Sequence, residues 1–309
     1  ILAVVIGGGV LGVEAAAALA LRGMQVSLLH RGPYLMDSQL DQHTAELLRT
    51  GLLARGITCV FQAQTVAYTA DAGGNVQAVR LSDGREIAAR RVVVAAGVKP
   101  DVALAQAAGL LCDRGILVSE TLQTSDPSIS AIGECCQQGN LTAGLVAPCW
   151  QQAEALAAHL AGMPAVPPVM EAAPLRLKVT GIELFCAGEL HGGEGTQIHT
   201  VSDPVDGHYR RLLLRDNRLC GVLLWGDISD GPAYFARISN PDPPLTPLSI
   251  FSAGDEPAAS GLSPVITEQL PAGVTRSKAM SKPVLVMAGH GMVGHHFLQQ
   301  LVERELHLQ

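Results

Sequence analysis

A glycine-rich segment near the N-terminus, Gly7-x-Gly9-x-x-Gly12, constrains the fold more than any other feature of the sequence. It follows the apolar run Leu2–Ile6 and precedes the Ala-rich segment Val10–Leu21, so we expect a strand, a tight turn and a helix in succession. In such a turn the first glycine allows the bend, the second lets a pyrophosphate approach the backbone, and the third lets helix and strand pack closely. Unpaired amides at the helix N-terminus favour an anion. The segment predicts a dinucleotide site, with a purely structural turn as the alternative.

The residues after the next expected strand, Gln25–Leu29, bear on which nucleotide would bind. An acidic residue at this position usually holds a ribose hydroxyl, but the sequence has His30 and Arg31. This basic pair is compatible with the 2′-phosphate of NADPH, and two exposed side chains without a ligand role are the alternative. Glu14 is the only charge in the first turns of the helix. We expect it either to face the nicotinamide side of the site or to be stabilised by the helix N-terminus.

Two segments further along predict more contacts with a cofactor. An apolar strand at 92–96, expected to be buried on both faces, ends at Gly97, where chain or ligand must come close. A strand at 131–134 would deliver Gly133 and Glu134 to its end, where a carboxylate can bind a ribose or ribityl hydroxyl. The alternative for this second segment is an ordinary strand and helix cap.

A second fingerprint, Gly289-x-Gly291-x-x-Gly294, lies between an expected strand at 284–287 and an expected helix at 295–304. Two fingerprints in one chain indicate two different dinucleotides. The neighbouring pair His295 and His296 predicts no metal site, because adjacent residues on a helix point in different directions.

Composition excludes several other classes. The net charge is −7 and only 4% of residues are aromatic, so we expect neither nucleic acid nor an anionic membrane as a partner. The apolar N-terminal stretch contains Glu14 and four glycines and predicts no membrane span. The seven cysteines include no CxxC pair, so we expect free thiols in the cytoplasm and no zinc or dithiol site. No general acid, base or nucleophile is evident.

Short alternating strands separated by Gly and Asp turns predict a second, smaller α+β region after about residue 175.

Apolar periodicity and turn residues predict further elements along the whole chain. These are helices at 41–55 and 148–160 and strands at 59–67, 76–81, 116–118, 177–179, 182–187, 208–214 and 219–225.

The order of these motifs resembles the FAD-dependent NAD(P)H oxidoreductases of the pyridine nucleotide-disulfide oxidoreductase superfamily. Within it, the sequence is most similar to the assimilatory nitrate and nitrite reductase flavoproteins. The resemblance rests on residues 6–14, 30–41, 124–135, 144–148 and 177–182, and residues 280–309 resemble the start of a nitrite reductase large subunit.

This resemblance implies an α/β, Rossmann-like fold with two dinucleotide-binding domains, incomplete here, and a small α+β C-terminal module. Gly7, Gly9, Gly12 and Glu14 would hold NAD(P)H. Gly133 and Glu134 would hold FAD, and Gly289, Gly291 and Gly294 would contact the flavin phosphates only in an intact chain. The implied parts are an NAD(P)H-binding domain at 1–101, the C-terminal part of an FAD-binding domain at 102–166, the α+β module at 167–248, a disordered linker at 249–279 and the start of an FAD-binding βαβ unit at 280–309.

The order of these parts is inverted relative to the family, and much of the FAD lobe is absent. We therefore expect a fragment that joins the tail of one flavoprotein to the start of its neighbour, with a circular permutant as the alternative.

The implied activity is hydride transfer from NAD(P)H to FAD, followed by electron transfer to a nitrite or nitrate reductase redox centre (a siroheme/iron–sulfur or molybdenum subunit). A non-catalytic nucleotide-binding module is one alternative. A disulfide, peroxide or ferredoxin reductase is another, and the missing cysteine pair counts against disulfide or peroxide chemistry.

Overall fold

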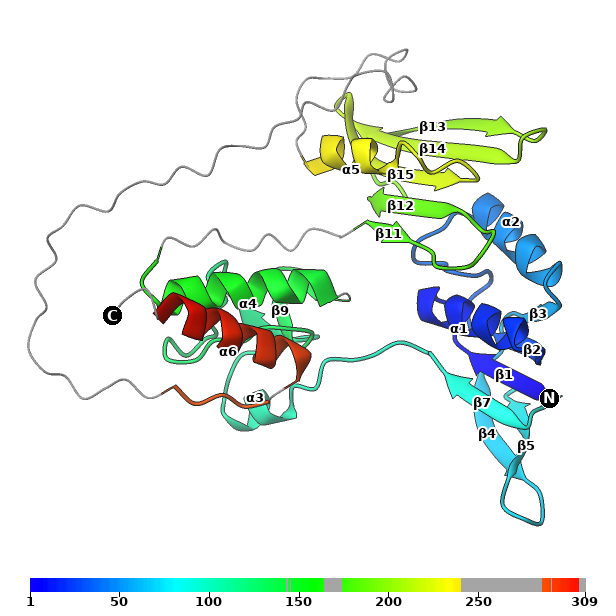
Figure 1. Ribbon diagram of the computed structural model, residues 1–309, viewed down its shortest axis with the longest axis horizontal. Coiled ribbons are helices and arrows are strands. Elements are labelled where there is room, and N and C mark those ends of the chain that lie inside the picture. The colour runs from blue at the N-terminus through cyan, green and yellow to red at the C-terminus, as the bar shows by residue number, and fades with distance from the viewer. Residues whose placement is uncertain (143, 145, 164–173, 240–284, 290, 306–309) are drawn as a thin grey trace, which may run out of the picture. The chain divides into compact units, whose positions relative to one another are not determined.

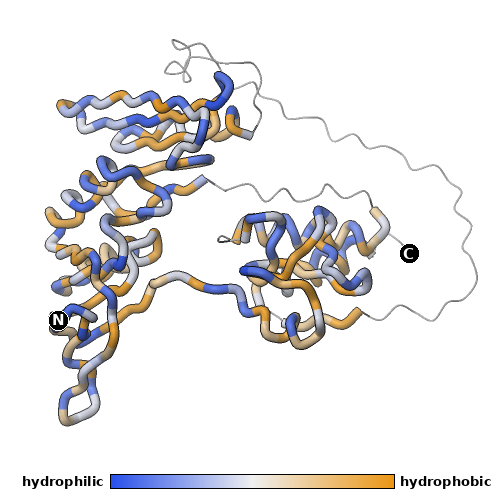
Figure 2. Tube along the Cα trace, turned by 180° about the vertical axis from the view of Figure 1, so that it is seen from behind, coloured by the Kyte–Doolittle hydropathy of each residue, from blue (hydrophilic) through white to orange (hydrophobic). Residues whose placement is uncertain are grey.

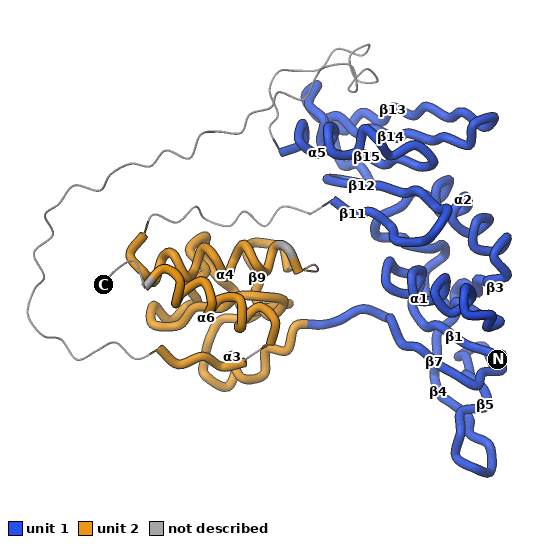
Figure 3. Tube along the Cα trace, in the orientation of Figure 1, with its two compact units in different colours: residues 1–99, 172–256 blue, residues 100–171, 257–309 orange. Residues whose placement is uncertain are grey.

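The computed structural model describes residues 1–142, 144, 146–163, 174–239, 285–289 and 291–305 (Figure 1). The chain divides into two compact units (Figure 3). Unit 1 comprises residues 1–99 and 172–256, and unit 2 comprises residues 100–171 and 257–309. Each unit therefore combines segments that are far apart in the sequence. The expected linker at 249–279 lies outside the described residues, and the five-part division remains a prediction.

Unit 1 is built on a four-stranded parallel sheet with the strand order β3-β2-β1-β7. Helices α1 and α2 make the connections between its first three strands (Figure 1). The strand order reverses beside β1, which is the position where open α/β sheets bind ligands. The bounds are β1 Leu2–Ile6, α1 Val10–Leu21, β2 Gln25–Leu29, α2 Gln42–Leu53, β3 Ile57–Val60 and β7 Arg91–Val94.

A three-stranded antiparallel meander separates β3 from β7 and consists of β4 (Thr65–Ala70), β5 (Val76–Leu81) and β6 (Glu86–Ala88). The single strand expected at 59–67 is wrong, because Gln62 has a φ of +51° that interrupts the extended backbone between β3 and β4. The burial expected for 92–96 is also wrong. Among the described residues β7 is the edge strand of its sheet, and Val94 is 63% exposed.

The α+β module of unit 1 is an antiparallel sheet in the order β11-β12-β15-β14-β13, followed by helix α5. Strand β13 is not among the expected elements, because its residues are mostly polar and exposed. The expected strand at 177–179 is wrong, because residues 177 and 178 are irregular and an isolated bridge between Val179 and Ile182 closes a turn at 180–181. The bounds are β11 Leu175–Arg176, β12 Leu184–Gly188, β13 Thr196–Asp203, β14 His208–Arg215, β15 Arg218–Trp225 and α5 Gly231–Ser239.

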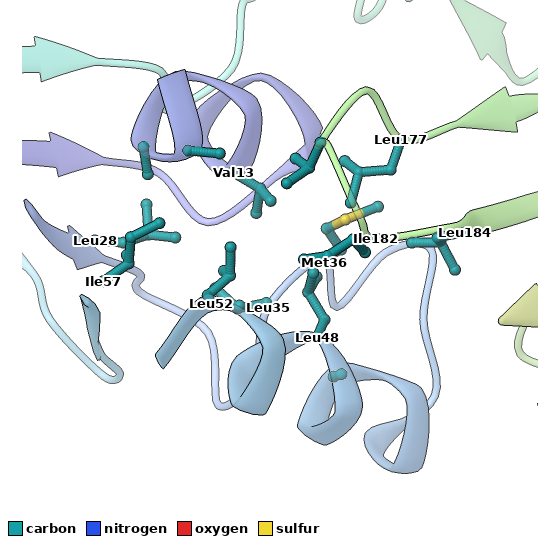
Figure 4. Close-up of a cluster of buried hydrophobic side chains, with 14 of the residues drawn as sticks. Val13, Leu28, Leu35, Met36, Leu48, Leu52, Ile57, Leu177, Ile182 and Leu184 are labelled. Atoms are coloured by element: carbon teal, nitrogen blue, oxygen red, sulfur yellow. The ribbon is translucent and has the colours of Figure 1, made fainter. Parts of the chain in front are cut away.

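One hydrophobic core joins the parallel sheet to this module (Figure 4). Val13 of α1 and Leu48 of α2 belong to the same buried cluster as Leu177, Ile182 and Leu184 of the module. Hydrophobic and hydrophilic residues interleave along the tube in both units, as expected for elements that bury one face (Figure 2). The module is therefore an integral part of unit 1.

A polar contact beside this core links α2 to β14. Asp41 caps α2 by accepting the Thr44 N–H at 3.0 Å. Its other oxygen accepts the Tyr209 hydroxyl at 2.9 Å and lies 3.3 Å from Arg211. Burial raises the pKa of Asp41, but these hydrogen bonds and the Arg211 charge lower it more, so its pKa lies below its ordinary value.

Unit 2 contains two helices packed against each other, α4 (Val146–Leu160) and α6 (Met292–Glu305). Phe297 of α6 is 3% exposed and lies in one buried cluster with Leu122 and with Ala153, Leu156 and Ala157 of α4. The shorter elements are α3 Ala103–Ala107, β8 Ile116–Val118, β9 Cys136–Gln138 and β10 Leu141–Thr142.

Two strands expected in unit 2 are wrong. Residues 131–134 form an irregular stretch and a turn, and the strand begins only at Cys136. Residues 285–287 are not a strand either, and Leu285 and Val286 are 50% and 84% exposed, so no neighbouring strand among the described residues pairs with them or covers them. Residue 284 lies outside the described residues. The C-terminal helix begins three residues before the expected position, at Met292.

Candidate dinucleotide-binding sites

The first fingerprint has the geometry that a pyrophosphate requires. Gly7 has a φ of +115°, and a Cβ there would lie 2.2 Å from the Ala95 carbonyl oxygen. A Cβ on Gly12 would lie 1.7 Å from the Gly7 carbonyl oxygen. A Cβ on Gly9 would meet nothing within 4 Å, and Gly9 caps α1 without a side-chain hydrogen bond. Two glycines are thus required by packing, whereas the third leaves open space beside the first amides of the helix.

Gly97 lies at the same end of the sheet as this turn. It follows β7, the neighbour of β1 on the side where the strand order reverses. Gly97 is exposed, has a φ of +91°, and a Cβ there would have no neighbour within 4 Å. The structure therefore places the predicted residues Gly7, Gly9 and Gly97 around one topological switch point.

His30 and Arg31 differ sharply in their surroundings. The His30 side chain is 14% exposed, and its Nδ1 accepts the Gly8 N–H at 3.1 Å. Its Nε2 is buried and lies 3.4 Å from the Asp37 carboxylate. Arg31 is exposed and has no ion pair or side-chain hydrogen bond among the described residues. His30 is therefore part of the turn itself, whereas Arg31 is available to a ligand.

Glu14 connects the fingerprint helix to the module. Its Oε1 accepts the backbone N–H of Lys178 at 2.9 Å, a contact between residues 164 positions apart. Arg55 holds the same turn by donating to the Thr180 carbonyl oxygen at 2.9 Å. The turn at 177–182 is thus fixed beside α1, and Glu14 has a structural contact that the sequence did not indicate.

The second fingerprint shares part of the geometry of the first, although a Cβ on Gly289 would meet nothing within 4 Å and residues 285–287 before it are not a strand. Gly289 has a φ of +99°, and a Cβ on Gly294 would lie 2.9 Å from the Gly289 carbonyl oxygen. A Cβ on Gly291 would meet nothing within 4 Å. The His295 N–H donates to the Gly291 carbonyl at 2.9 Å, just as the Val13 N–H donates to the Gly9 carbonyl at 3.0 Å. Each unit therefore contains a glycine turn that begins a helix, but among the described residues only the turn of unit 1 follows a paired strand.

Unit 2 brings the second fingerprint next to Gly133. A Cβ on Gly133 would lie 3.8 Å from the Val293 side chain, although the two residues are 160 positions apart. Gly133 has a φ of +89° and donates its N–H to the buried Gln152 side chain at 2.7 Å. Glu134 is exposed in the turn that follows. Two segments that the sequence assigned separately to FAD thus lie together.

Sequence reasoning missed Gln152 and Asp37. Gln152 is fully buried on α4 and fixes the Gly133 turn. In the sequence, Gln152 stands on the apolar side of the helix, three positions after Cys149 and four before Leu156, and a polar residue there could have indicated a buried hydrogen bond. Asp37 has no comparable signal, because only the fold of the preceding loop brings it to His30.

The cysteines do not form a redox site among the described residues. All seven are free. Burial raises the pKa of Cys136 and of Cys186 to about 12 and that of Cys59 to about 11, which disfavours the reactive thiolate. No group of three potential metal ligands occurs among the described residues. None of the described helices is both long and apolar enough to span a membrane.

Comparison with known proteins identifies the fold. Residues 2–155 match the model of the pyridine nucleotide-disulphide oxidoreductase family, and residues 175–240 match that of the rubredoxin NAD+ reductase C-terminal domain. The chain belongs to the pyridine nucleotide-disulphide oxidoreductase family. This confirms the predicted Rossmann-like flavoprotein fold and oxidoreductase class, and it supports FAD and NAD(P)H as the cofactors.

Curated relatives agree with this assignment. The chain is 35% identical over 302 residues to nitrite reductase [NAD(P)H] of Bacillus subtilis, covering 98% of this chain and 36% of that protein. It is 40% identical over 228 residues to the assimilatory nitrate reductase electron transfer subunit of the same organism, covering 74% of this chain and 29% of that protein. The chain therefore spans about a third of the length of these relatives.

Two solved reductases are also similar to this chain. A ferredoxin reductase from Rhodopseudomonas palustris matches with a TM-score of 0.67 and 27% identity, over 75% of this chain and 58% of that one. Putidaredoxin reductase in a covalent complex with putidaredoxin matches with a TM-score of 0.71 and 26% identity, over 82% of this chain and 61% of that one.

Proposed function

We propose that this chain is the NAD(P)H-oxidising flavoprotein part of an enzyme of nitrogen assimilation, acting in the cytoplasm. It would pass electrons from NAD(P)H through FAD to a nitrite or nitrate reductase redox centre. The names of the relatives, nitrite reductase [NAD(P)H] and assimilatory nitrate reductase electron transfer subunit, support this reaction and this class of partner. A siroheme/iron–sulfur or a molybdenum centre would be the immediate acceptor.

One observation carries the proposal: each unit contains a glycine turn that begins a helix, with a positive φ at its first glycine and open space at its second, and the turn of unit 2 lies beside Gly133. Two such turns are what a protein that handles two dinucleotides needs. Because α6 packs on α4, the C-terminal fingerprint and the 124–135 segment form one site within this chain.

The residues have distinct roles in this proposal. The open amides after Gly9 would bind the pyrophosphate of the nicotinamide nucleotide, and those after Gly291 would bind that of FAD. Gly133 and Glu134 would contact FAD hydroxyls, and Gln152 would hold their turn in place through its bond to Gly133. When bound, FAD supplies the capacity to accept a hydride and to release single electrons. The chain supplies binding and orientation rather than a general acid or base.

Matched substitutions in the two turns test the proposal. Valine at Gly9 or Gly291 meets no protein atom at its Cβ, so each variant should fold while its side chain obstructs a phosphate. We expect Gly9→Val to weaken NADH binding about tenfold or more while FAD is retained, and Gly291→Val to weaken FAD binding by a similar factor while NADH binding is retained.

The activity itself is measured by adding NADH or NADPH anaerobically to the FAD-loaded protein. Bleaching of the flavin absorbance is the expected result for the wild type. Gly9→Val should need about tenfold or more NADH for the same bleaching, and Gly291→Val should show less bleaching because it retains less FAD. Nucleotide affinity without any flavin binding would instead identify a non-catalytic nucleotide-binding module. Disulfide or peroxide reduction is disfavoured by the buried, high-pKa thiols.

A further inference from the structure

We propose that Asp37 is the ribose ligand of the nicotinamide nucleotide, that His30 positions it, and that the chain therefore selects NADH over NADPH. This inference rests on the proposed function, since it requires a nucleotide at the first fingerprint. The fingerprint pattern places an acidic ribose ligand at position 30, directly after β2. Here that role is assigned to Asp37, seven positions later. It also replaces the interpretation of His30 as a ligand for a 2′-phosphate.

His30 is bound at one nitrogen to the glycine turn and faces the carboxylate with the other. The Gly8 N–H donates to Nδ1 at 3.1 Å, so Nδ1 carries no proton and the neutral ring carries its proton on Nε2. Nε2 is buried, lies 3.4 Å from Asp37 Oδ1, and has no hydrogen-bond partner among the described residues. The ring therefore presents an N–H toward Asp37.

The loop that carries Asp37 folds back onto the fingerprint. Met36 is 1% exposed, has a φ of +50°, and donates its backbone N–H to the Gly8 carbonyl oxygen at 2.8 Å. Both backbone groups of Gly8 are thus engaged, one by His30 and the other by Met36. This contact fixes the position of residue 37 relative to the turn that would hold the pyrophosphate.

Two glycines make room for this arrangement. A Cβ on Gly8 would lie 2.7 Å from the His30 ring. A Cβ on Gly32 would lie 2.1 Å from Asp37 Oδ2 and 2.7 Å from His30 Nε2. No side chain fits at either position without displacing the imidazole or the carboxylate. Glycine at positions 8 and 32 therefore allows the His30 ring and the Asp37 carboxylate to lie together beside the fingerprint turn.

The position and charge of Asp37 suit a ribose with free hydroxyls. The ribose of a bound dinucleotide lies at the carboxyl end of the second strand, and His30 directly follows β2. The Asp37 side chain is 36% exposed, so it can accept a hydroxyl proton from a ligand. A 2′-phosphate would instead bring two negative charges together. The exposed Arg31 would instead attract a 2′-phosphate, but no ion pair or side-chain hydrogen bond among the described residues fixes its position.

The test is titration of the flavin-free full chain with NADH and with NADPH, measuring the dissociation constant Kd for each. We expect the wild type to bind NADH about tenfold more tightly than NADPH. Asp37→Asn should reduce this ratio about tenfold, because it removes the charge that repels the 2′-phosphate. Asp83→Asn, at an exposed turn of unit 1, is the matched control and should leave the ratio unchanged.

Variants of His30 separate positioning from folding. His30→Phe removes both nitrogen contacts and should lower the selectivity ratio. His30→Gln, which can accept from Gly8 and donate to Asp37, should restore much of it. A wild type that prefers NADPH, or binds both nucleotides equally, would overturn this inference alone, as would an unchanged ratio in Asp37→Asn. A wild type that binds neither nucleotide would overturn the proposed function and this inference together.

Discussion

Replacing Phe297 with alanine tests whether the C-terminal helix is part of unit 2. The ring is 3% exposed and lies in a cluster with Leu122, Ala153 and Leu156. A buried phenylalanine covers roughly 150–250 Å², which at about 25 cal/mol/Å² corresponds to roughly 4–6 kcal/mol as an upper bound. Core substitutions of this kind cost about 3–5 kcal/mol. We expect Phe297→Ala to reduce the free energy of unfolding of unit 2 by about 3 kcal/mol.

The two tryptophans allow this unit to be followed by itself. Trp150 of α4 lies in unit 2, with its ring 5.4 Å from that of His296 on α6, and Trp225 belongs to unit 1. In a Trp225→Phe background, urea unfolding monitored by Trp150 fluorescence reports on unit 2. With a denaturant slope of about 1.5 kcal/mol/M, the midpoint should fall by about 2 M.

Met292→Ala on the same helix is the matched control, because Met292 is 62% exposed. It should change the unfolding free energy by less than about 0.5 kcal/mol. If Phe297→Ala shifts the midpoint no more than this control does, then α6 does not pack on α4 in solution. The second fingerprint and Gly133 would then not form one site.

Three further predictions concern the fingerprint, pH and the thiols. Gly12→Ala should abolish measurable NADH binding in a direct titration, because its Cβ would lie 1.7 Å from the Gly7 carbonyl oxygen; unchanged affinity would contradict the turn geometry. The pKa of Asp41 is lower in the folded protein than its ordinary value, because hydrogen bonds outweigh the effect of burial. Its contribution to stability is therefore present above about pH 4 and is lost as the pH falls through the pKa of the folded state. Asp41→Asn should make the stability of unit 1, measured by thermal unfolding, depend less on pH in this range. Cys136 and Cys186, with pKa values of about 12, should resist alkylation at pH 8 in the native protein when labelling is read by mass spectrometry; rapid labelling would reopen a thiol-based activity.

Local features of the sequence determined the glycine turns and most elements of unit 1. Gly7 and Gly12 are recognisable because the positive φ of Gly7 and the close approach of Gly12 to the Gly7 carbonyl both arise within six residues, whereas the contact of Gly7 with Ala95 is long-range. The helices at 10–21 and 42–53 were likewise predictable from apolar spacing, and Asp41 marks the start of the second through its bond to Thr44. Backbone geometry and short-range periodicity were sufficient for these assignments.

Contacts between distant residues decided the rest. Neither the packing of Phe297 on α4 nor the approach of Val293 to Gly133 follows from sequence spacing, since loop closure over 160 residues depends on which surfaces are complementary. The strand expected at 131–134 failed for a related reason: an apolar run forms a strand only where a neighbour pairs with it. The role of His30 was decided in the same way, because its ring is oriented by Gly8 and faces Asp37 only after the loop folds back. Sequence therefore identified the chemistry of the turns, whereas tertiary structure determined which side chains surround them.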